Sequence, residues 1–376
     1  MVASVGTGRP LPAAGWLDAD IPADAAEAGV SPLYEAFDKA LITRGFRGLI
    51  TSDISDRIVL ATDNSIYQLL PDSVLFPSCV DDLQLIAALA DEPRFHEVVF
   101  RPRGGGTGTN GQSLGQGAVV DCSRFMNRIL EINAEQRWVR VEPGVVKDQL
   151  NEALRPHGLF FAPELSTSNR ATIGGMISTD ACGQGSCRYG KTSDHVLSLD
   201  VVLVGGELLT TQPEAVNRLA DMPGRAGEAL RTLETISREH ADAIQAGFPK
   251  LNRAMTGYDL AHLRDDEGRI DAKAVICGAE GTLGLIAEAR LNILPIPTSS
   301  TLVIIFYADF NRALRDAPAL TRLGATSVET IDGKVLAMAR GDASWSQIAH
   351  LFPDTEALGT NILEFSGDDE IGRAHV

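Results

Sequence analysis

The chain has 376 residues, of which 44% are hydrophobic and 22% charged, and its formal net charge is −17. This is the composition of a globular protein long enough for two domains, and its acidity argues against nucleic acid or an anionic membrane as a main partner. No apolar run approaches the roughly 18 residues of a membrane span, so we expect no transmembrane segment.

Residues 1–30 are rich in Ala, Gly, Pro and Asp and predict a loose lead, which with the following helix makes an N-terminal segment over 1–45. The four-residue spacing of Leu33, Phe37 and Leu41 predicts an amphipathic helix. Beyond residue 73, apolar runs alternate with helical spacings. The expected elements are a helix over 31–45 that ends at Gly45, strands over 73–77 and 97–101, and a helix over 80–92.

Later apolar runs predict more strands of the same kind and a helix ended by Gly158. The expected elements are strands over 118–123, 138–144 and 199–206, and a helix over 147–158. Residues 213–271 are charged, largely helical and rich in loops, and we expect them to form an insertion before the sheet resumes over 273–297. A new unit with alternating strands and helices begins near residue 301 and continues to Phe365. The mixture predicts an α+β fold.

The last residues, IGRAHV, can be back-translated to ATCGGAAGAGCACACGTC, a common sequencing-adapter sequence. We therefore expect residues 371–376 to be non-native and the natural chain to continue beyond about Glu370. A genuine C-terminus at Val376 is disfavoured because the unit that begins near residue 301 would then be barely started. A stop codon after Val376 in an adapter-trimmed copy of the gene would exclude read-through.

The stretch RPRGGGTGTNGQ, residues 101–112, contains Gly106, Gly108 and Gly111 in the GxGxxG spacing of dinucleotide-binding turns. A Rossmann turn would open a helix and place an acidic residue about 20 positions later. Here SLGQGAVVDCS follows, with more glycine and a second apolar run, and Asp121 arrives too early. A P-loop is excluded because no Gly-Lys-Ser/Thr closes the stretch. The sequence predicts a strand–loop–strand turn.

Three further segments, 138–150, 161–206 and 277–295, join this loop, and glycine and small hydroxyl residues recur among them. Backbone N–H groups exposed in such turns form anion-binding nests that suit a pyrophosphate. Within residues 101–112, Thr107, Thr109 and Asn110 offer neutral donors and Arg103 a charge. Tight turns of a β-rich fold are the alternative, but several such loops together favour a bound dinucleotide.

The cysteines and histidines show no metal-site spacing. The five cysteines form no Cys-x-x-Cys pair, which favours reduced thiols in a cytoplasmic protein over a disulfide or metal role. Cys182 and Cys187 are interpreted as bystanders in a glycine loop. The scattered histidines predict no metal site; those considered are His157, His195, His240 and His262.

Four short motifs carry a family resemblance: Arg103-Gly-Gly-Gly-Thr-Gly, Thr172-Ile-Gly-Gly, Tyr189-Gly and Glu280-Gly-Thr-Leu-Gly. Together they resemble the FAD-binding domain of the vanillyl-alcohol oxidase/p-cresol methylhydroxylase (PCMH) superfamily. Residues 62–77, 102–112 and 163–176 most resemble the bacterial D-2-hydroxyglutarate dehydrogenase-type fusion flavoproteins. Those proteins join this domain to a substrate-binding cap and a C-terminal iron–sulfur module.

The resemblance implies a two-subdomain PCMH-type FAD-binding domain over 46–298, split near Asp121, with FAD between the halves. Residues 299–370 would be the truncated start of an α/β cap. In this reading residues 104–110 cradle the pyrophosphate, while 163–168 and 172–178 pass the isoalloxazine and the ribityl chain. The implied cofactor-binding residues are Arg103, Gly104, Gly105, Gly106, Thr107, Gly108, Thr109, Asn110, Pro163, Leu165, Ser166, Ser168, Thr172, Gly174, Gly175, Ser178, Gly183, Glu280 and Gly281.

Two departures from the family pattern bear on the cofactor. Some relatives tether FAD to a histidine where this chain has Thr107, and others to a cysteine where it has Ser168, so we expect non-covalent FAD. The family's substrate arginine and its histidine-rich site belong to the cap and have no counterpart here. We therefore expect the catalytic base and an iron–sulfur cluster to lie beyond this chain, and residues 1–376 to be inactive alone.

The implied activity is oxidation of a D-2-hydroxy acid, such as D-2-hydroxyglutarate or D-lactate, by hydride transfer to flavin N5. Electrons would then pass to the iron–sulfur cluster or another acceptor. We expect the protein in the cytoplasm, or peripherally at the inner membrane through its electron acceptor. Two alternatives stay open. One is a flavin reductase of the enolpyruvyl-sugar type, and the other is a non-catalytic FAD-binding module.

Overall fold

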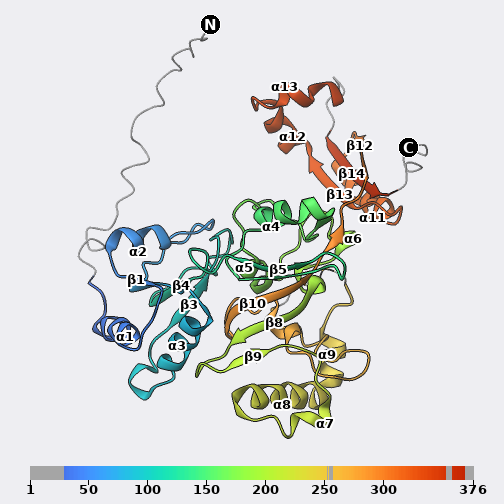
Figure 1. The fold of residues 1–376 in the computed structure, drawn as a ribbon. Coiled ribbons are helices and arrows are strands. Elements are labelled where there is room, and N and C mark those ends of the chain that lie inside the picture. Colours follow the sequence, from blue (N-terminus) through green and yellow to red (C-terminus); the bar gives the residue numbers. More distant parts are fainter. Residues whose placement is uncertain (1–28, 252, 254–256, 353–357, 369–376) are drawn as a thin grey trace, which may run out of the picture.

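The computed structural model describes residues 29–251, 253, 257–352 and 358–368 (Figure 1). Most of the expected lead, residues 1–28, and the expected non-native tail, 371–376, lie outside the described residues. None of the described helices is long and apolar enough to cross a lipid bilayer. Figure 1 shows a mixed α/β architecture built on two larger sheets and a smaller third one.

The first sheet has four strands in the order β1-β2-β4-β3. Its strands β2, β4 and β3 run parallel, and β1 pairs antiparallel with β2. Phe37, Leu75, Leu83 and Val120 are fully buried in the core where the helices meet this sheet. Its elements are β1 (Leu49–Thr51), β2 (Ser73–Phe76), β3 (Phe100–Arg103), β4 (Ala118–Asp121), α1 (Pro32–Thr43), α2 (Ile54–Leu60) and α3 (Val80–Ala90).

The second sheet has five antiparallel strands in the order β5-β6-β10-β8-β9. Buried and half-buried residues alternate along its central strand β10, so one face is covered by a core. The strands are β5 (Ile129–Asn133), β6 (Trp138–Val141), β8 (Val196–Val202), β9 (Leu208–Thr210) and β10 (Leu285–Asn292). The associated helices are α4 (Lys147–Leu154), α5 (Ile173–Ser178), α6 (Ser186–Tyr189), α7 (Val216–Leu219), α8 (Gly224–Glu239), α9 (Ala241–Gly247) and α10 (Lys273–Ile276).

The two larger sheets share part of one core. Val202, Leu285 and Ala287 belong to strands of the second sheet, yet they pack in the apolar cluster of the first. This contact packs the start of β10 against the first sheet. A short pair, β7 (Leu159–Phe160) with β11 (Leu294–Pro295), extends the second unit.

The third sheet is antiparallel, in the order β12-β14-β13, and carries α11 on one face. It contacts the second unit through Arg188 of α6, whose guanidinium donates to Thr326 Oγ1 and to the Ser366 carbonyl. Its elements are β12 (Ser299–Tyr307), α11 (Phe310–Thr321), β13 (Ser327–Asp332), α12 (Gly333–Arg340), α13 (Trp345–Ile348) and β14 (Gly359–Gly367).

Most of the predicted elements are confirmed, including the strand–loop–strand connection from β3 to β4 and the left-handed Gly158 (φ +69°) that follows the α4 segment. The strand expected over 97–101 is misplaced, because a 3₁₀ turn at Pro93–Phe95 and its continuation delay β3 to Phe100. Strands β1, β5, β7 and β9 were not predicted. The first sheet ends at Asp121, and the domain boundaries remain a prediction.

Candidate functional site

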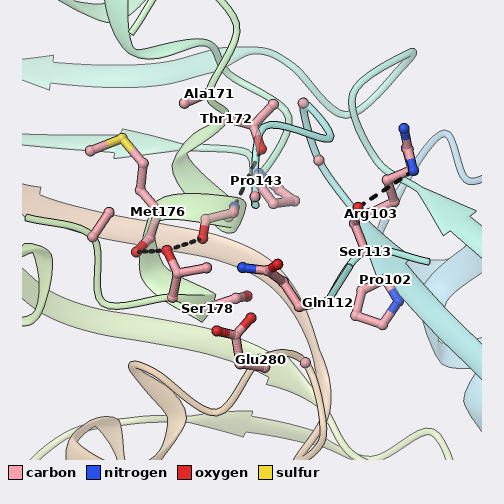
Figure 2. Close-up of a pocket in the computed structure, with 18 of the residues that line it drawn as sticks. Pro102, Arg103, Gln112, Ser113, Pro143, Ala171, Thr172, Met176, Ser178 and Glu280 are labelled. Carbon is pink, nitrogen blue, oxygen red and sulfur yellow. Dashed lines mark hydrogen bonds between the residues drawn. The ribbon is translucent and has the colours of Figure 1, made fainter. Parts of the chain in front are cut away.

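A cavity of about 430 Å³ is lined by residues of both larger sheet units (Figure 2). Three segments form most of its wall: the loop after β3, the stretch from residue 165 through α5 to 182, and the connection from α10 into β10. The volume lies within the range of small-molecule and cofactor pockets. Segments that are far apart in the sequence therefore converge on one concave site.

Most of the cofactor-binding residues expected from the sequence lie in this wall: Arg103, Gly104, Gly105, Gly106, Thr107, Gly108, Thr109, Leu165, Thr172, Gly174, Gly175, Ser178, Glu280 and Gly281. Five others do not line it: Asn110, Pro163, Ser166, Ser168 and Gly183. Asn110 and Ser166 are exposed, whereas Pro163 is buried.

The glycines of the wall allow its segments to touch one another. A Cβ atom added at Gly174 would lie 2.7 Å from Cβ of Pro143. A Cβ atom added at Gly104, Gly105 or Gly281 would overlap an atom of the neighbouring segment. The sequence suggested that these glycines admit a ligand, but their immediate neighbours are protein atoms. The four pairs are Gly104 with Thr172, Gly105 with Arg170, Gly174 with Pro143, and Gly281 with Pro102.

The glycine loop, residues 104–109, lines the cavity and has unused backbone donors. Within the part of the chain that the structure describes, the backbone N–H groups of these residues donate no hydrogen bond. Unpaired backbone N–H groups are uncommon in folded proteins and, gathered in one turn, they form a nest for an anion. The arrangement fits a pyrophosphate.

Arg103 lies in the wall, but its guanidinium is directed away from Glu280 and Met176 (Figure 2). Nη2 donates to the Thr62 carbonyl at 2.7 Å and Nη1 to the Leu60 carbonyl at 3.3 Å. Burial lowers the pKa of Arg103, and the charges of nearby carboxylates oppose that shift. The expected donor of positive charge to the cofactor is therefore engaged with the protein's own backbone.

Helix α5 begins where its segment runs beside the Pro143–Gly144 turn. Ile173 N donates to the Val145 carbonyl and Gly174 N to the Pro143 carbonyl, both at 2.8 Å. The Thr172 hydroxyl caps the helix by accepting from Gly175 N at 3.3 Å. These bonds join the start of α5 to the turn that follows β6.

Glu280 extends into the cavity toward Ser178 and Gln112 (Figure 2). Its backbone has a left-handed φ of +52° and is held by a 2.8 Å hydrogen bond from its N–H to the Ser178 carbonyl. It is the one carboxylate in the cavity wall that the structure describes. Partial burial raises the pKa of this carboxyl above its ordinary value.

Several wall residues were missed by sequence reasoning. Leu285 and Ile286 follow directly after the Glu280-Gly-Thr-Leu-Gly motif, so the start of the next apolar run was the available signal. Cys122 was regarded only as a thiol without a partner, and burial raises its pKa to about 12. The missed residues are Pro102, Gln112, Ser113, Cys122, Pro143, Ala171, Thr179, Ala181, Cys182, Ile276, Ala279, Leu283, Gly284, Leu285 and Ile286, whereas Thr167 and Met176 fall within the expected ranges 163–168 and 172–178.

Comparison with known proteins gives a consistent result. Residues 71–212 match the family described as FAD binding domain. The chain is 57% identical over 342 residues to a D-2-hydroxyglutarate dehydrogenase of Pseudomonas putida, with 89% of this chain and 34% of the relative covered. It is 53% identical over 350 residues to a D-2-hydroxyglutarate dehydrogenase of Escherichia coli K12, with 91% of this chain and 34% of the relative covered. The chain thus spans about a third of these relatives.

A solved alkyldihydroxyacetonephosphate synthase resembles the fold, with a TM-score of 0.63 and 18% sequence identity. The match covers 91% of this chain and 58% of the synthase. At this level of identity the likeness concerns the fold alone.

Proposed function

We propose that this chain, which contains an FAD-binding domain and is homologous to D-2-hydroxyglutarate dehydrogenases over about a third of their length, is the FAD-binding part of a D-2-hydroxy acid dehydrogenase. The observation that carries the proposal is the cavity, where the glycine loop with its unused N–H groups meets α5 and the Glu280–Gly281 turn. Its wall joins an anion-binding edge to an apolar floor, as a flavin dinucleotide requires.

In the proposed complex, the N–H groups of residues 104–109 and the hydroxyls of Thr107 and Thr109 bind the pyrophosphate. Residues 172–178 and the Glu280–Gly281 turn border the isoalloxazine and the ribityl chain. Bound FAD supplies a hydride acceptor at N5, and the protein supplies its orientation and electrostatic surroundings. We propose non-covalent binding, because Thr107 and Ser168 stand where family members carry a tethering histidine or cysteine.

The remaining features of the longer protein are proposed from the family resemblance. They comprise a D-2-hydroxy acid substrate, a base and a substrate-binding arginine in the cap, and an iron–sulfur cluster or other acceptor for the electrons. The first two sheets would be the two halves of a PCMH-type domain, and the third sheet the beginning of the cap. A cytoplasmic location, or one peripheral to the inner membrane, belongs to the same proposal.

A chimeric enzyme tests the proposal. This chain replaces the corresponding third of the Pseudomonas putida relative, and the purified chimera is mixed anaerobically with D-2-hydroxyglutarate, L-2-hydroxyglutarate, D-lactate or NADPH. Bleaching of the flavin by a D-2-hydroxy acid, and not by the L-enantiomer, supports the proposal. A chimera that binds FAD and is bleached only by NADPH would indicate a flavin reductase. An FAD-loaded chimera that none of these compounds bleaches would favour a non-catalytic module.

A further inference from the structure

Residues 61–70 form a closed strap beside the glycine loop. Leu69 N donates to the Ala61 carbonyl at 3.0 Å, and Thr62 pairs with Gln68 in an antiparallel bridge. Asp63 Oδ1 tightens the tip by accepting from Ser65 N at 2.8 Å. The match to the FAD-binding family begins at residue 71, so the strap lies just outside it.

The strap is bonded directly to the glycine loop and its base. Asn64 N donates to the carbonyl of Gly106 at 3.1 Å. Arg103, which immediately precedes the loop, donates to the Thr62 carbonyl, and Ser113 Oγ donates to Asp63 Oδ2 at 2.9 Å. On the far side of the loop, a Cβ atom at Gly111 would lie 2.9 Å from the Tyr67 ring. The glycine loop is thus held at its middle by Asn64, and the residues on either side of it are held by the strap as well.

A glycine-rich loop needs such support if it is to bind a ligand tightly. Consecutive glycines lose more conformational freedom on ordering than other residues, and a ligand that must order them binds more weakly. Gly106 holds a left-handed φ of +61°, and its carbonyl is the group that Asn64 engages. The bonds from the strap therefore hold the loop in a conformation in which it lines the cavity and its N–H groups are unpaired.

Asp63 is the centre of this arrangement. Its carboxylate accepts from both Ser65 and Ser113, and the Arg103 guanidinium reaches the same Ser113 hydroxyl at 3.5 Å. Burial of Asp63 acts to raise its pKa, but the hydrogen bonds and the Arg103 charge together hold the pKa of this carboxyl below its ordinary value. The carboxylate is thus ionised at neutral pH.

We infer that the strap, residues 61–70, pre-organises the glycine loop for FAD, with Asp63 and Arg103 as positioning residues that act through the strap and not by contact with the cofactor. The inference rests on the proposed binding of FAD in this cavity. It assigns a role to Arg103 that differs from the phosphate contact expected from the sequence.

The test uses the 376-residue chain, with Asp63→Ala as the main variant and Asp342→Ala as its matched control. Like Asp63, Asp342 accepts one hydrogen bond from a serine backbone N–H and one from a serine hydroxyl. Both come from Ser344, and Asp342 lies in the third unit, away from the strap in the sequence. FAD affinity is measured by quenching of flavin fluorescence. We expect Kd to rise on the order of tenfold in Asp63→Ala and to stay unchanged in Asp342→Ala. Equal Kd values in Asp63→Ala and the wild type, or equal losses in both variants, would overturn the inference.

A second readout needs no FAD. Trypsin can cut the Arg103–Gly104 bond only when the loop opens locally. The neighbouring Arg101 is not a competing site, because trypsin does not cut before proline and Pro102 follows it. We expect faster cleavage at Arg103 in apo Asp63→Ala than in the wild type and in Asp342→Ala. The same rate in all three would contradict the inference. If the wild type binds no FAD, the proposed function fails, and the cleavage rates still report whether the strap holds the loop.

A double-mutant cycle separates positioning from direct contact. If Arg103 and Asp63 act through one strap, the variant with both changed to alanine binds FAD no more weakly than Arg103→Ala alone. If the rises in Kd of the two single variants multiply in the double variant, Arg103 acts independently of the strap, and its assignment as a positioning residue is overturned. Asp63→Asn, which keeps one acceptor oxygen, should give an intermediate Kd and serves if Asp63→Ala fails to fold.

Discussion

Replacement of Gly106 by alanine tests whether the conformation of the glycine loop determines cofactor affinity. Gly106 has φ +61°, and an added Cβ atom would lie 2.5 Å from Nη2 of Arg103, the nitrogen that donates to the Thr62 carbonyl. The substitution therefore imposes a left-handed backbone on a residue with a Cβ atom and displaces the arginine from its acceptor.

The magnitude follows from these two effects. A left-handed conformation costs a non-glycine residue roughly 1–2 kcal/mol, and loss of a hydrogen bond from a charged group costs about 1.5–3 kcal/mol. Together they disfavour the loop conformation that binds FAD by about 2.5–5 kcal/mol. Because 1.4 kcal/mol corresponds to a factor of ten in affinity, Kd should rise roughly 60-fold to several thousand-fold.

Gly158→Ala is the matched control. Gly158 has a similar φ of +69°, but no atom lies within 4 Å of an added Cβ, and the residue is not part of the cavity wall. It should reduce stability by roughly 1–2 kcal/mol and leave the Kd for FAD unchanged. Both variants are titrated with FAD by flavin fluorescence quenching. Wild-type affinity in Gly106→Ala would refute the reasoning, because it would show that the loop is only a turn.

Three further results are expected. Acid precipitation of the FAD-loaded chain should release all flavin into the supernatant, since Thr107 and Ser168 replace the tethering residues; yellow flavin in the pellet would contradict this. Burial raises the pKa of Asp38 to about 7 from an ordinary 3.8, so the folded protein holds a proton that the unfolded chain releases, and stability falls as pH rises from about 4 to 7. Asp38→Asn should therefore unfold at a higher temperature than the wild type at pH 8 and at a similar temperature near pH 4; the same difference at both pH values would contradict the assignment. Finally, FAD bound to this chain should not bleach anaerobically with D-2-hydroxyglutarate, because Glu280 is the only carboxylate and Arg103 the only cation in the described part of the wall, and Arg103 is engaged with backbone carbonyls. Rapid bleaching would place the catalytic groups within the described residues.

Strong periodicity made the helices and longer strands predictable. The spacing of Leu33, Phe37 and Leu41 reports a buried helix face, and all of these but Leu33 are fully buried in the structure. Strand β9 was not predicted because three residues carry too little pattern, and its pairing with β8 is a tertiary contact. The start of β3 was misplaced because Glu97 belongs to the turn that follows the 3₁₀ helix Pro93–Phe95, and β3 begins only at Phe100.

The residues of the candidate site were predictable where a sequence motif forms the backbone of a turn. They were less predictable where the role of a side chain depends on the residue that it contacts in the fold. The glycines were found from their spacing, but the atoms that Gly104, Gly105 and Gly281 touch, such as the Arg170 carbonyl against Gly105, lie more than 60 positions away in the chain. For the same reason the charge of Arg103 suggested a phosphate contact, whereas carbonyls of Leu60 and Thr62 receive its hydrogen bonds.

A crystal structure of the chain with FAD bound tests the central claim most directly. We expect one FAD in the cavity, with pyrophosphate oxygens within hydrogen-bond distance of the N–H groups of residues 104–109 and the isoalloxazine beside residues 172–178 and Glu280. Arg103 should keep its bonds to the Leu60 and Thr62 carbonyls. Flavin bound elsewhere, or a pyrophosphate that leaves the loop N–H groups unpaired, would contradict the account.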